Sequence, residues 1–185
     1  GDKTALMLGR VTLNPLKHID PIGTVLVPIA LLLLGGFVFG WAKAVPISPK
    51  NFKNPARDMA WVSVAGPLSN LLMAIGWALL AKFGYMISVD GHDSMSLGQF
   101  LIYSGLAGIA INLVLMVLNL IPIPPLDGSR VLSALLPNSL AYRYNQIEPY
   151  GFFILLGLLF LGVLGPIISG PYQAIQGFIL NMVGL

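Results

Sequence analysis

Residues 100–128 read FLIYSGLAGIAINLVLMVLNLIPIPPLDG, a long apolar run that ends in three prolines and an acid. The apolar part, residues 100–121, can cross a bilayer as one helix, since a spanning helix needs about 20 apolar residues. The prolines that follow remove backbone donors and break that helix. Polar backbone at such a break is tolerated only where it borders protein or water. The stretch therefore predicts a membrane helix that opens onto a polar cavity.

Asp127 follows the prolines directly, and an ionisable residue at membrane depth is a functional-site hypothesis by default. The other interpretation is structural, with Asp127 as the N-cap of a short surface helix over residues 128–136. The residues alone leave both interpretations open, because depth in the membrane cannot be deduced from this stretch.

The composition independently indicates a membrane protein. Of the 185 residues 56% are hydrophobic and only 9% are charged, with a mean hydropathy of +0.84, whereas a soluble domain is about 25% charged. The chain has no cysteine, which excludes disulfides and thiolate metal sites. The net charge of +3 comes from clustered Lys and Arg, a pattern that fits cytoplasmic loops better than nucleic-acid binding.

The apolar stretches predict an all-α polytopic membrane protein with three to four transmembrane helices. We expect one membrane-embedded domain over residues 1–185, with a re-entrant or short β segment near the N-terminus. Residues 9–15 resemble a short strand ended by proline, and residues 169–185 an interfacial or re-entrant helix. The four strongly apolar stretches are residues 22–41, 60–81, 100–121 and 150–168.

The linker charges predict an orientation. Lys and Arg concentrate in residues 42–58 and 129–147, whereas residues 83–97 carry Asp90 and Asp93, so the positive-inside rule places the first two linkers in the cytoplasm. Basic residues also precede the first apolar stretch, which would put both of its ends inside. That stretch is then either re-entrant or an ordinary tilted helix with a weak charge signal, and both remain open.

Two further sets of residues could carry chemistry. Gly66-Pro67 kinks the second stretch and Asn70 lies one turn later, an arrangement that alone is best explained by interhelical packing. The two histidines, His18 and His92, lack the i, i+4 spacing that places two imidazoles on one helix face.

The ordered motifs resemble the site-2 protease family of intramembrane zinc metalloproteases, in its compact bacterial branch. NLIPIPPLDG (119–128) resembles the family's Asn-x-x-Pro-x-x-x-Leu-Asp-Gly signature, and AGPLSN (65–70) its Gly-Pro-x-x-Asn motif. The same branch is matched by GRVTLNPLKHIDPIG (9–23), FGWAKAVPI (39–47) and NFKNPARDM (51–59).

The resemblance implies a protease that cuts membrane-spanning substrates, with Asp127 as third Zn²⁺ ligand. It implies that Asn119 polarises the scissile carbonyl, that Asn70 lies near the site, and that residues 11–14 or 36–45 hold the substrate extended. The implied location is a multi-pass position in the bacterial inner membrane, with the lipid bilayer and a membrane-protein substrate as partners and no nucleic acid.

One family motif is missing. The two remaining zinc ligands belong to a His-Glu-x-x-His helix that these 185 residues do not contain, and we expect it upstream of residue 1. Alone, the 185 residues are expected neither to bind catalytic zinc tightly nor to hydrolyse peptides. The alternatives are a degenerate, non-catalytic homologue or a membrane transporter or scaffold.

Overall fold

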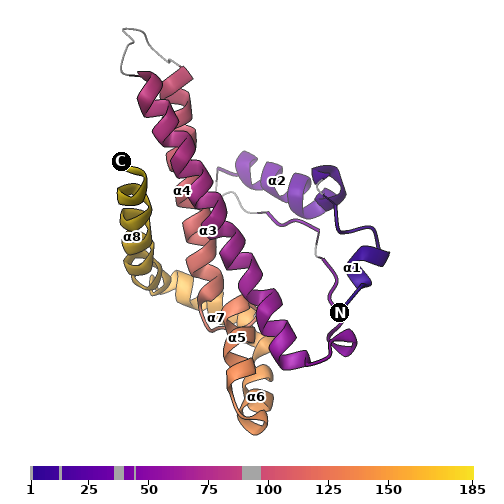
Figure 1. Ribbon diagram of the computed structural model, residues 1–185. Helices are drawn as coiled ribbons and strands as arrows, with labels where there is room; N and C mark the ends of the chain where they lie inside the picture. Colours follow the sequence, from indigo (N-terminus) through magenta and orange to yellow (C-terminus); the bar gives the residue numbers. More distant parts are fainter. Residues whose placement is uncertain (1, 13, 36–39, 44, 89–96) are drawn as a thin grey trace. The chain divides into compact units, whose positions relative to one another are not determined.

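The computed structural model describes residues 2–12, 14–35, 40–43, 45–88 and 97–185. These residues form two compact units, Gly1–Pro55 and Ala56–Leu185. All regular elements in the described part of the chain are helical, which confirms the predicted all-α class (Figure 1).

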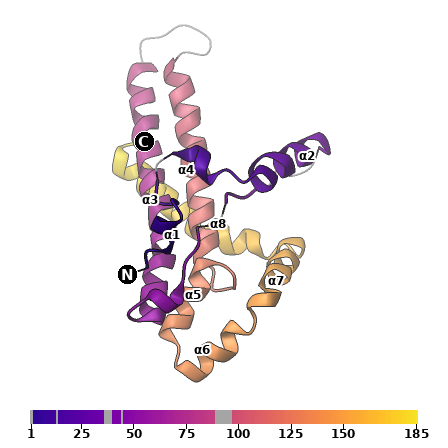
Figure 2. The ribbon, with the colours of Figure 1, turned by 90° about the vertical axis from the view of Figure 1, so that its right-hand side faces the viewer.

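The second unit is built on a long antiparallel helix pair. Its helices are α3 (Pro55–Ser88), α4 (Leu97–Leu120), α5 (Asp127–Leu135), α6 (Asn138–Asn145), α7 (Glu148–Phe160) and α8 (Leu164–Val183). By length and composition α3 and α4 can each cross a membrane, and α7 with α8, bent by 83°, can count as one broken span or a re-entrant loop. Figure 2 shows α3 and α4 side by side along most of their length.

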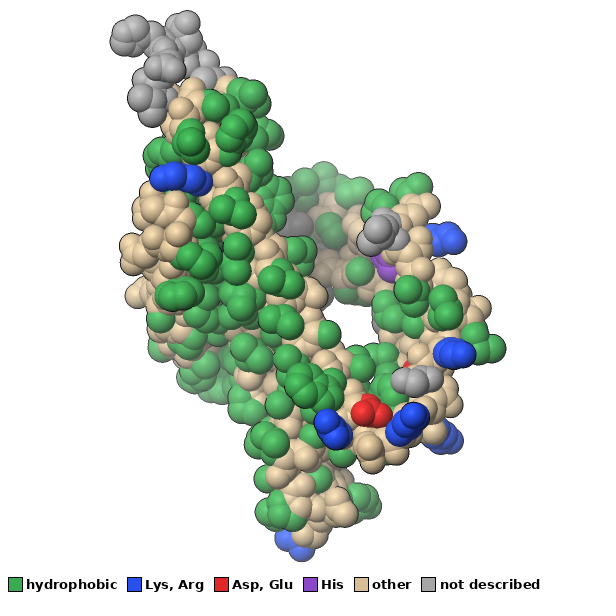
Figure 3. All heavy atoms as spheres, in the orientation of Figure 1, with side chains coloured by type: hydrophobic (Ala, Val, Ile, Leu, Met, Phe, Trp, Pro, Cys, Tyr) green, Lys and Arg blue, Asp and Glu red, His purple; other side chains and the backbone are tan. Residues whose placement is uncertain are grey.

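Small residues allow α3 and α4 to approach closely. A Cβ atom added at Gly105 would lie 2.7 Å from the Ala81 Cβ, and one added at Gly84 would lie 2.7 Å from the Gly98 carbonyl oxygen. Small residues at such a seam replace the hydrophobic driving force that is missing between helices in lipid. Many hydrophobic side chains lie on the visible face of these helices in Figure 3, as expected of helices long and apolar enough to cross a membrane.

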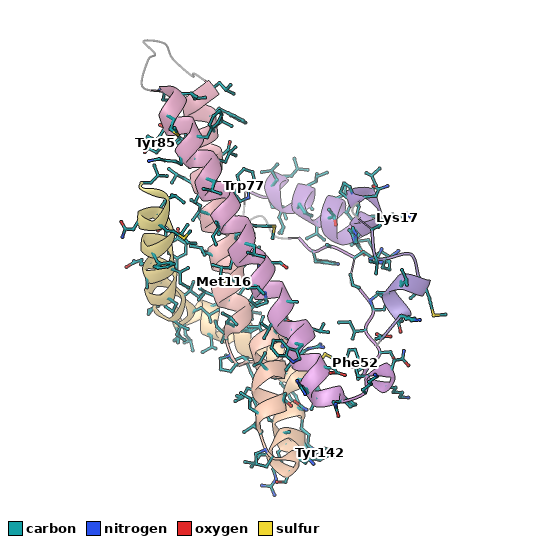
Figure 4. All side chains as sticks on the ribbon, viewed as in Figure 1. Lys17, Phe52, Trp77, Tyr85, Met116 and Tyr142 are labelled. Atoms are coloured by element: carbon teal, nitrogen blue, oxygen red, sulfur yellow. The ribbon has the colours of Figure 1, made fainter. Side chains whose placement is uncertain are left out.

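Helix α8 packs against α4 and completes the core of this unit. Ile179 of α8 is buried with Ile109, Leu113 and Met116 of α4; Met116 is labelled in Figure 4. At the far end of α8, the Lys82 ammonium group of α3 donates a hydrogen bond to the Gly184 carbonyl oxygen over 2.7 Å. A cation at a helix C-terminus satisfies a carbonyl that has no helical donor.

The fourth apolar stretch departs from its prediction. Helix α7 ends at Phe160, and Gly162 takes a left-handed φ of +70° before α8 begins at Leu164. Glycine adopts this conformation without steric cost, so the chain turns there rather than at Gly170-Pro171. The helix boundary predicted at residue 169 is wrong, because Pro171 is accommodated inside α8.

The first unit consists of short elements. They are α1 (Thr4–Met7), η1 (Pro15–His18), the π-helical turn η2 (Pro21–Leu26), α2 (Val27–Leu33) and η3 (Pro49–Asn51). The apolar helix Pro21–Leu33, formed by η2 and α2, is shorter than a spanning helix. It covers only part of the first apolar stretch, of which residues 36–39 lie outside the described residues.

The short strand predicted over residues 9–15 is not seen among the described residues, which exclude Leu13. Backbone amides in this segment form local hydrogen bonds with side chains instead of pairing with another strand. The Asn14 amide donates to the Thr12 hydroxyl, and the Leu16 amide donates to the Asn14 side chain. Such side-chain bonds compete with strand pairing.

Candidate functional site

Asp127 lies at the first position of α5, directly after the proline-rich turn. The N-cap residue is Leu126, which makes no side-chain cap hydrogen bond, so the structure does not use Asp127 as the N-cap. Its negative charge in the first turn is still favoured by the helix dipole.

Tight backbone packing fixes the turn that presents Asp127. A Cβ atom at Gly128 would overlap the Leu120 carbonyl oxygen, and one at Gly151 of α7 would overlap the Pro124 carbonyl oxygen. The Tyr144 hydroxyl of α6 donates to the Pro122 carbonyl oxygen over 2.8 Å. The glycine that follows the aspartate is therefore required by the close approach of α5 to the end of α4.

The carboxylate of Asp127 points at Gly66 of α3, next to Pro67. A Cβ atom at Gly66 would lie 3.1 Å from Asp127 Oδ2, and the buried Ser63 hydroxyl hydrogen-bonds the carboxylate. Pro67 lacks an N–H, so the Ser63 carbonyl is deprived of its usual helical donor at the same level. The structure thus joins two sequence motifs that lie about 60 residues apart.

The electrostatic environment of Asp127 is mixed. Burial raises the pKa of the Asp127 carboxyl group, while the Arg130 charge and the Ser63 hydrogen bond act in the opposite direction. Arg130 also donates to the Met59 sulfur over 3.3 Å and lies 4.0 Å from the Glu148 carboxylate. Arg130 therefore contacts side chains of α3 and α7 while its charge also acts on Asp127 of its own helix.

Asn70 and Asn119 are both partly buried, one on each long helix. Asn70 follows Ser63 by seven positions, which places both on one face of α3. In the antiparallel pair, Trp77 faces Gly108 and Ala81 faces Gly105. Counted on to the end of α4, the same register would match Asn119 with Gly66. The placement of both asparagines beside Asp127 stays a prediction. Their roles remain predictions.

A complete metal site is not formed by the described residues, among which no group of three His, Cys, Asp or Glu side chains could hold an ion. His18 belongs to the first unit, where its Nε2 lies 3.0 Å from the Thr12 carbonyl oxygen; His92 lies outside the described residues. Asp127 nevertheless fits one ligand position for zinc, since its half-buried carboxylate is held against a glycine and carboxylate oxygen is a zinc ligand.

Ser63 was not identified by the sequence interpretation. It precedes Gly66 by three positions and Asn70 by seven, and this helical spacing is the only signal that could have found it. Serine is also common as a small packing residue in membrane helices, so the spacing alone would not have distinguished the two roles.

Fold and site together define a membrane protein with a carboxylate held between two helices. A sequence profile of Peptidase family M50 matches residues 80–162. YwhC of Bacillus subtilis (strain 168), which is named as a proposed zinc metalloprotease, is 42% identical over 173 residues, covering 92% of this chain and 74% of YwhC.

Two further relatives, both called Rip2 and also named as proposed zinc metalloproteases, are each 30% identical. The protein from Mycolicibacterium smegmatis is matched over 86% of this chain and 57% of its own length. The protein from Mycobacterium tuberculosis H37Rv is matched over 100% and 65%. No solved structure matches significantly. The chain belongs to peptidase family M50, which confirms the family resemblance.

Proposed function

We propose that this chain forms part of a zinc metalloprotease that hydrolyses peptide bonds of membrane-spanning substrates. The observation that carries the proposal is the Asp127 carboxylate, which is fixed by the turn after α4 and held against Gly66 and Ser63 of α3. The relatives' names support zinc as the metal. The two histidine ligands would come from a His-Glu-x-x-His helix outside these 185 residues.

Each residue of the site has a proposed task. Asp127 would hold the metal through a carboxylate oxygen, and the Ser63 hydroxyl orients that carboxylate through its hydrogen bond. The Asn119 amide donates to the scissile carbonyl as negative charge develops on it, and Asn70 supports this arrangement from α3. Zinc in such a site supplies Lewis-acid chemistry and activates water.

The first unit offers an edge for an extended substrate. The Trp41 amide donates to the Gly23 carbonyl oxygen over 3.0 Å, and the Lys43 amide donates to the His18 carbonyl oxygen over 2.9 Å. We place the substrate strand along this segment, where it would pair with the backbone of residues 40–43.

The test compares Asp127→Asn with the parent in the complete protein. This variant keeps a side chain that can bond Ser63 but removes the charge, so we expect loss of most bound zinc and a drop in cleavage of at least about 100-fold. Asn119→Ala should lower turnover by about 100-fold or more with zinc retained. Asn181→Ala, at an exposed position of α8, serves as the control. Unchanged zinc content and activity in Asp127→Asn would refute the assignment.

We further propose a multi-pass arrangement in the bacterial inner membrane, with residues 42–58 and 129–147 in the cytoplasm and 83–97 outside. Because the chain has no cysteine, single cysteines can be placed at Ser48, Ser139 and His92. An impermeant thiol reagent added outside should label the His92 position alone. Labelling of Ser48 or Ser139 from outside would contradict this orientation.

A further inference from the structure

A basic surface pocket of the first unit takes no part in the proposed zinc chemistry, although Lys43, which lines it, also belongs to the proposed substrate edge. Its volume is about 380 Å³, and Arg10, Lys17 and Lys43 are among the residues that line it. This size falls within the range of about 300–1,000 Å³ that is usual for small-molecule sites. Lys17 is labelled in Figure 4.

The guanidinium group of Arg10 holds the pocket together. It donates to the carbonyl oxygens of Lys17 and Lys43, the latter over 2.8 Å, and the Lys43 amide donates to His18. These hydrogen bonds hold the segment around Lys17 next to the segment around Lys43. The acceptors of the two hydrogen bonds from Arg10 are neutral backbone carbonyl groups.

The acids of this unit are engaged elsewhere. Residues 1–55 contain only two, Asp2 and Asp20, and neither lines the pocket. The Asp2 carboxylate accepts hydrogen bonds from Ser48 and Asn51, and the Asp20 carboxylate accepts them from the amides that begin η2. No carboxylate of this unit therefore lines the pocket beside Lys17 and Lys43, whose positive charges attract an anion.

Exposed leucines border the same pocket. Leu8 is 61% exposed and Leu16 is 72% exposed, and both line it; Met7, next to Leu8, is 83% exposed. Apolar side chains clustered around an exposed site mark a surface that contacts another apolar body. A free phosphate ion would bind the cations and leave these leucines in water. A lipid would contact the cations with its headgroup and the leucines with its acyl chains.

We propose that this pocket binds the phosphate headgroup of an anionic phospholipid between Lys17 and Lys43, with the acyl chains along Leu8 and Leu16. The expected cytoplasmic position of these residues supports this occupant, because the cytoplasmic leaflet carries the anionic lipids. The site does not depend on the proposed proteolysis, and its test does not require activity.

The experiment measures retention of phosphatidylglycerol and phosphatidylcholine by the purified full chain, using native mass spectrometry from neutral detergent. Lys17→Gln with Lys43→Gln should weaken phosphatidylglycerol binding about thirtyfold, since each lysine near an anionic headgroup contributes about 1 kcal/mol. The matched control is Lys50→Gln with Lys53→Gln, which removes two exposed lysines of the same unit that do not line the pocket. It should change binding less than about threefold.

Two further arms separate a lipid from free phosphate. Leu16→Ser should weaken phosphatidylglycerol binding, and inorganic phosphate at millimolar concentration should not displace the lipid. The proposal fails if both lysine pairs have equal effects, if phosphatidylcholine binds as well as phosphatidylglycerol, or if Leu16→Ser has no effect while phosphate competes. Circular dichroism of each variant checks that the fold is retained.

Discussion

The two units of this chain are each stabilised internally by a different kind of interaction. Residues 1–55 carry six Lys and Arg and two Asp, whereas residues 56–185 carry four Lys and Arg and five Asp and Glu. Among the described residues of the first unit only Gly23 is buried, while the second unit buries a continuous apolar cluster between α3, α4 and α8.

The difference teaches which kind of change each unit tolerates. In the second unit, backbones meet at glycine and alanine, so added volume is the damaging change. In the first unit, charged side chains bond backbone groups, through Arg10, Asp2 and Asp20, so altered charge is the damaging change.

The largest effect is expected from Gly128→Ala in the second unit. The added methyl group overlaps the Leu120 carbonyl oxygen, and backbone cannot move aside as a side chain can, so we expect destabilisation by about 3 kcal/mol. The measurement is denaturant unfolding in micelles. Gly165→Ala in α8 is the control, because a Cβ atom there meets nothing within 4 Å. Equal stability of Gly128→Ala and Gly165→Ala would contradict the claim that added volume is the damaging change in the second unit.

The second largest effect is expected from Gly66→Ala in α3, which should lower zinc affinity and cleavage without lowering stability. The new Cβ atom would press on Asp127 Oδ2 at 3.1 Å, so zinc affinity and cleavage by the complete protein should fall about tenfold. Helix stability should not fall, because alanine is favoured over glycine by up to about 1 kcal/mol. Gly76→Ala gives the same helical gain without a contact and should keep full activity. Parallel behaviour of the two variants would contradict the placement of the carboxylate.

The smallest effect concerns Asp2 and should appear only in the first unit. Hydrogen bonds from Asn51, Ser48 and Thr4 hold the pKa of the Asp2 carboxyl group well below its usual range. Since the folded pKa lies below the unfolded value of about 3.9, the stabilisation is present above that pH and is lost as the pH falls below it. Asp2→Ala should therefore reduce hydrogen-exchange protection of residues 48–51 at pH 7.

At pH 3 the difference between the parent and Asp2→Ala should shrink, because the Asp2 carboxyl group of the opened segment is then largely protonated, which makes opening of the parent easier. Protection in the second unit should be the same in both proteins at each pH. A difference that grows as the pH falls would show that the carboxylate is not the stabilising form.

The long helices could be predicted because composition and length determine them. The predicted stretch at residues 100–121 lies within three residues of α4, whereas α3 extends beyond the predicted stretch 60–81 by five residues at its start and seven at its end. The short helix predicted over residues 128–136 is α5 shifted by one residue. Asp127 was singled out because a broken apolar helix leads directly to it. The structure adds that the carboxylate is turned toward α3, which no local pattern records.

The features that sequence missed depend on tertiary packing. The contact of Ser63 with Asp127 joins residues far apart in the chain, and its only local trace is a helical spacing shared with many packing residues. The turn at Gly162 was overlooked because Gly170-Pro171 has the stronger breaking pattern, yet α8 continues through that proline. A left-handed glycine in an apolar run resembles any other helical glycine until its conformation is known.

The glycine seam between α3 and α4 limits how this sequence can drift. Glycine is the smallest residue, so every mutation at Gly84, Gly98 or Gly105 adds atoms to a place where backbone already touches backbone or Cβ. The exposed leucines and isoleucines of the same helices can exchange with one another freely, because lipid accepts any apolar shape. In a library of random variants selected for folding, these glycines should be the last positions of the hairpin to diversify.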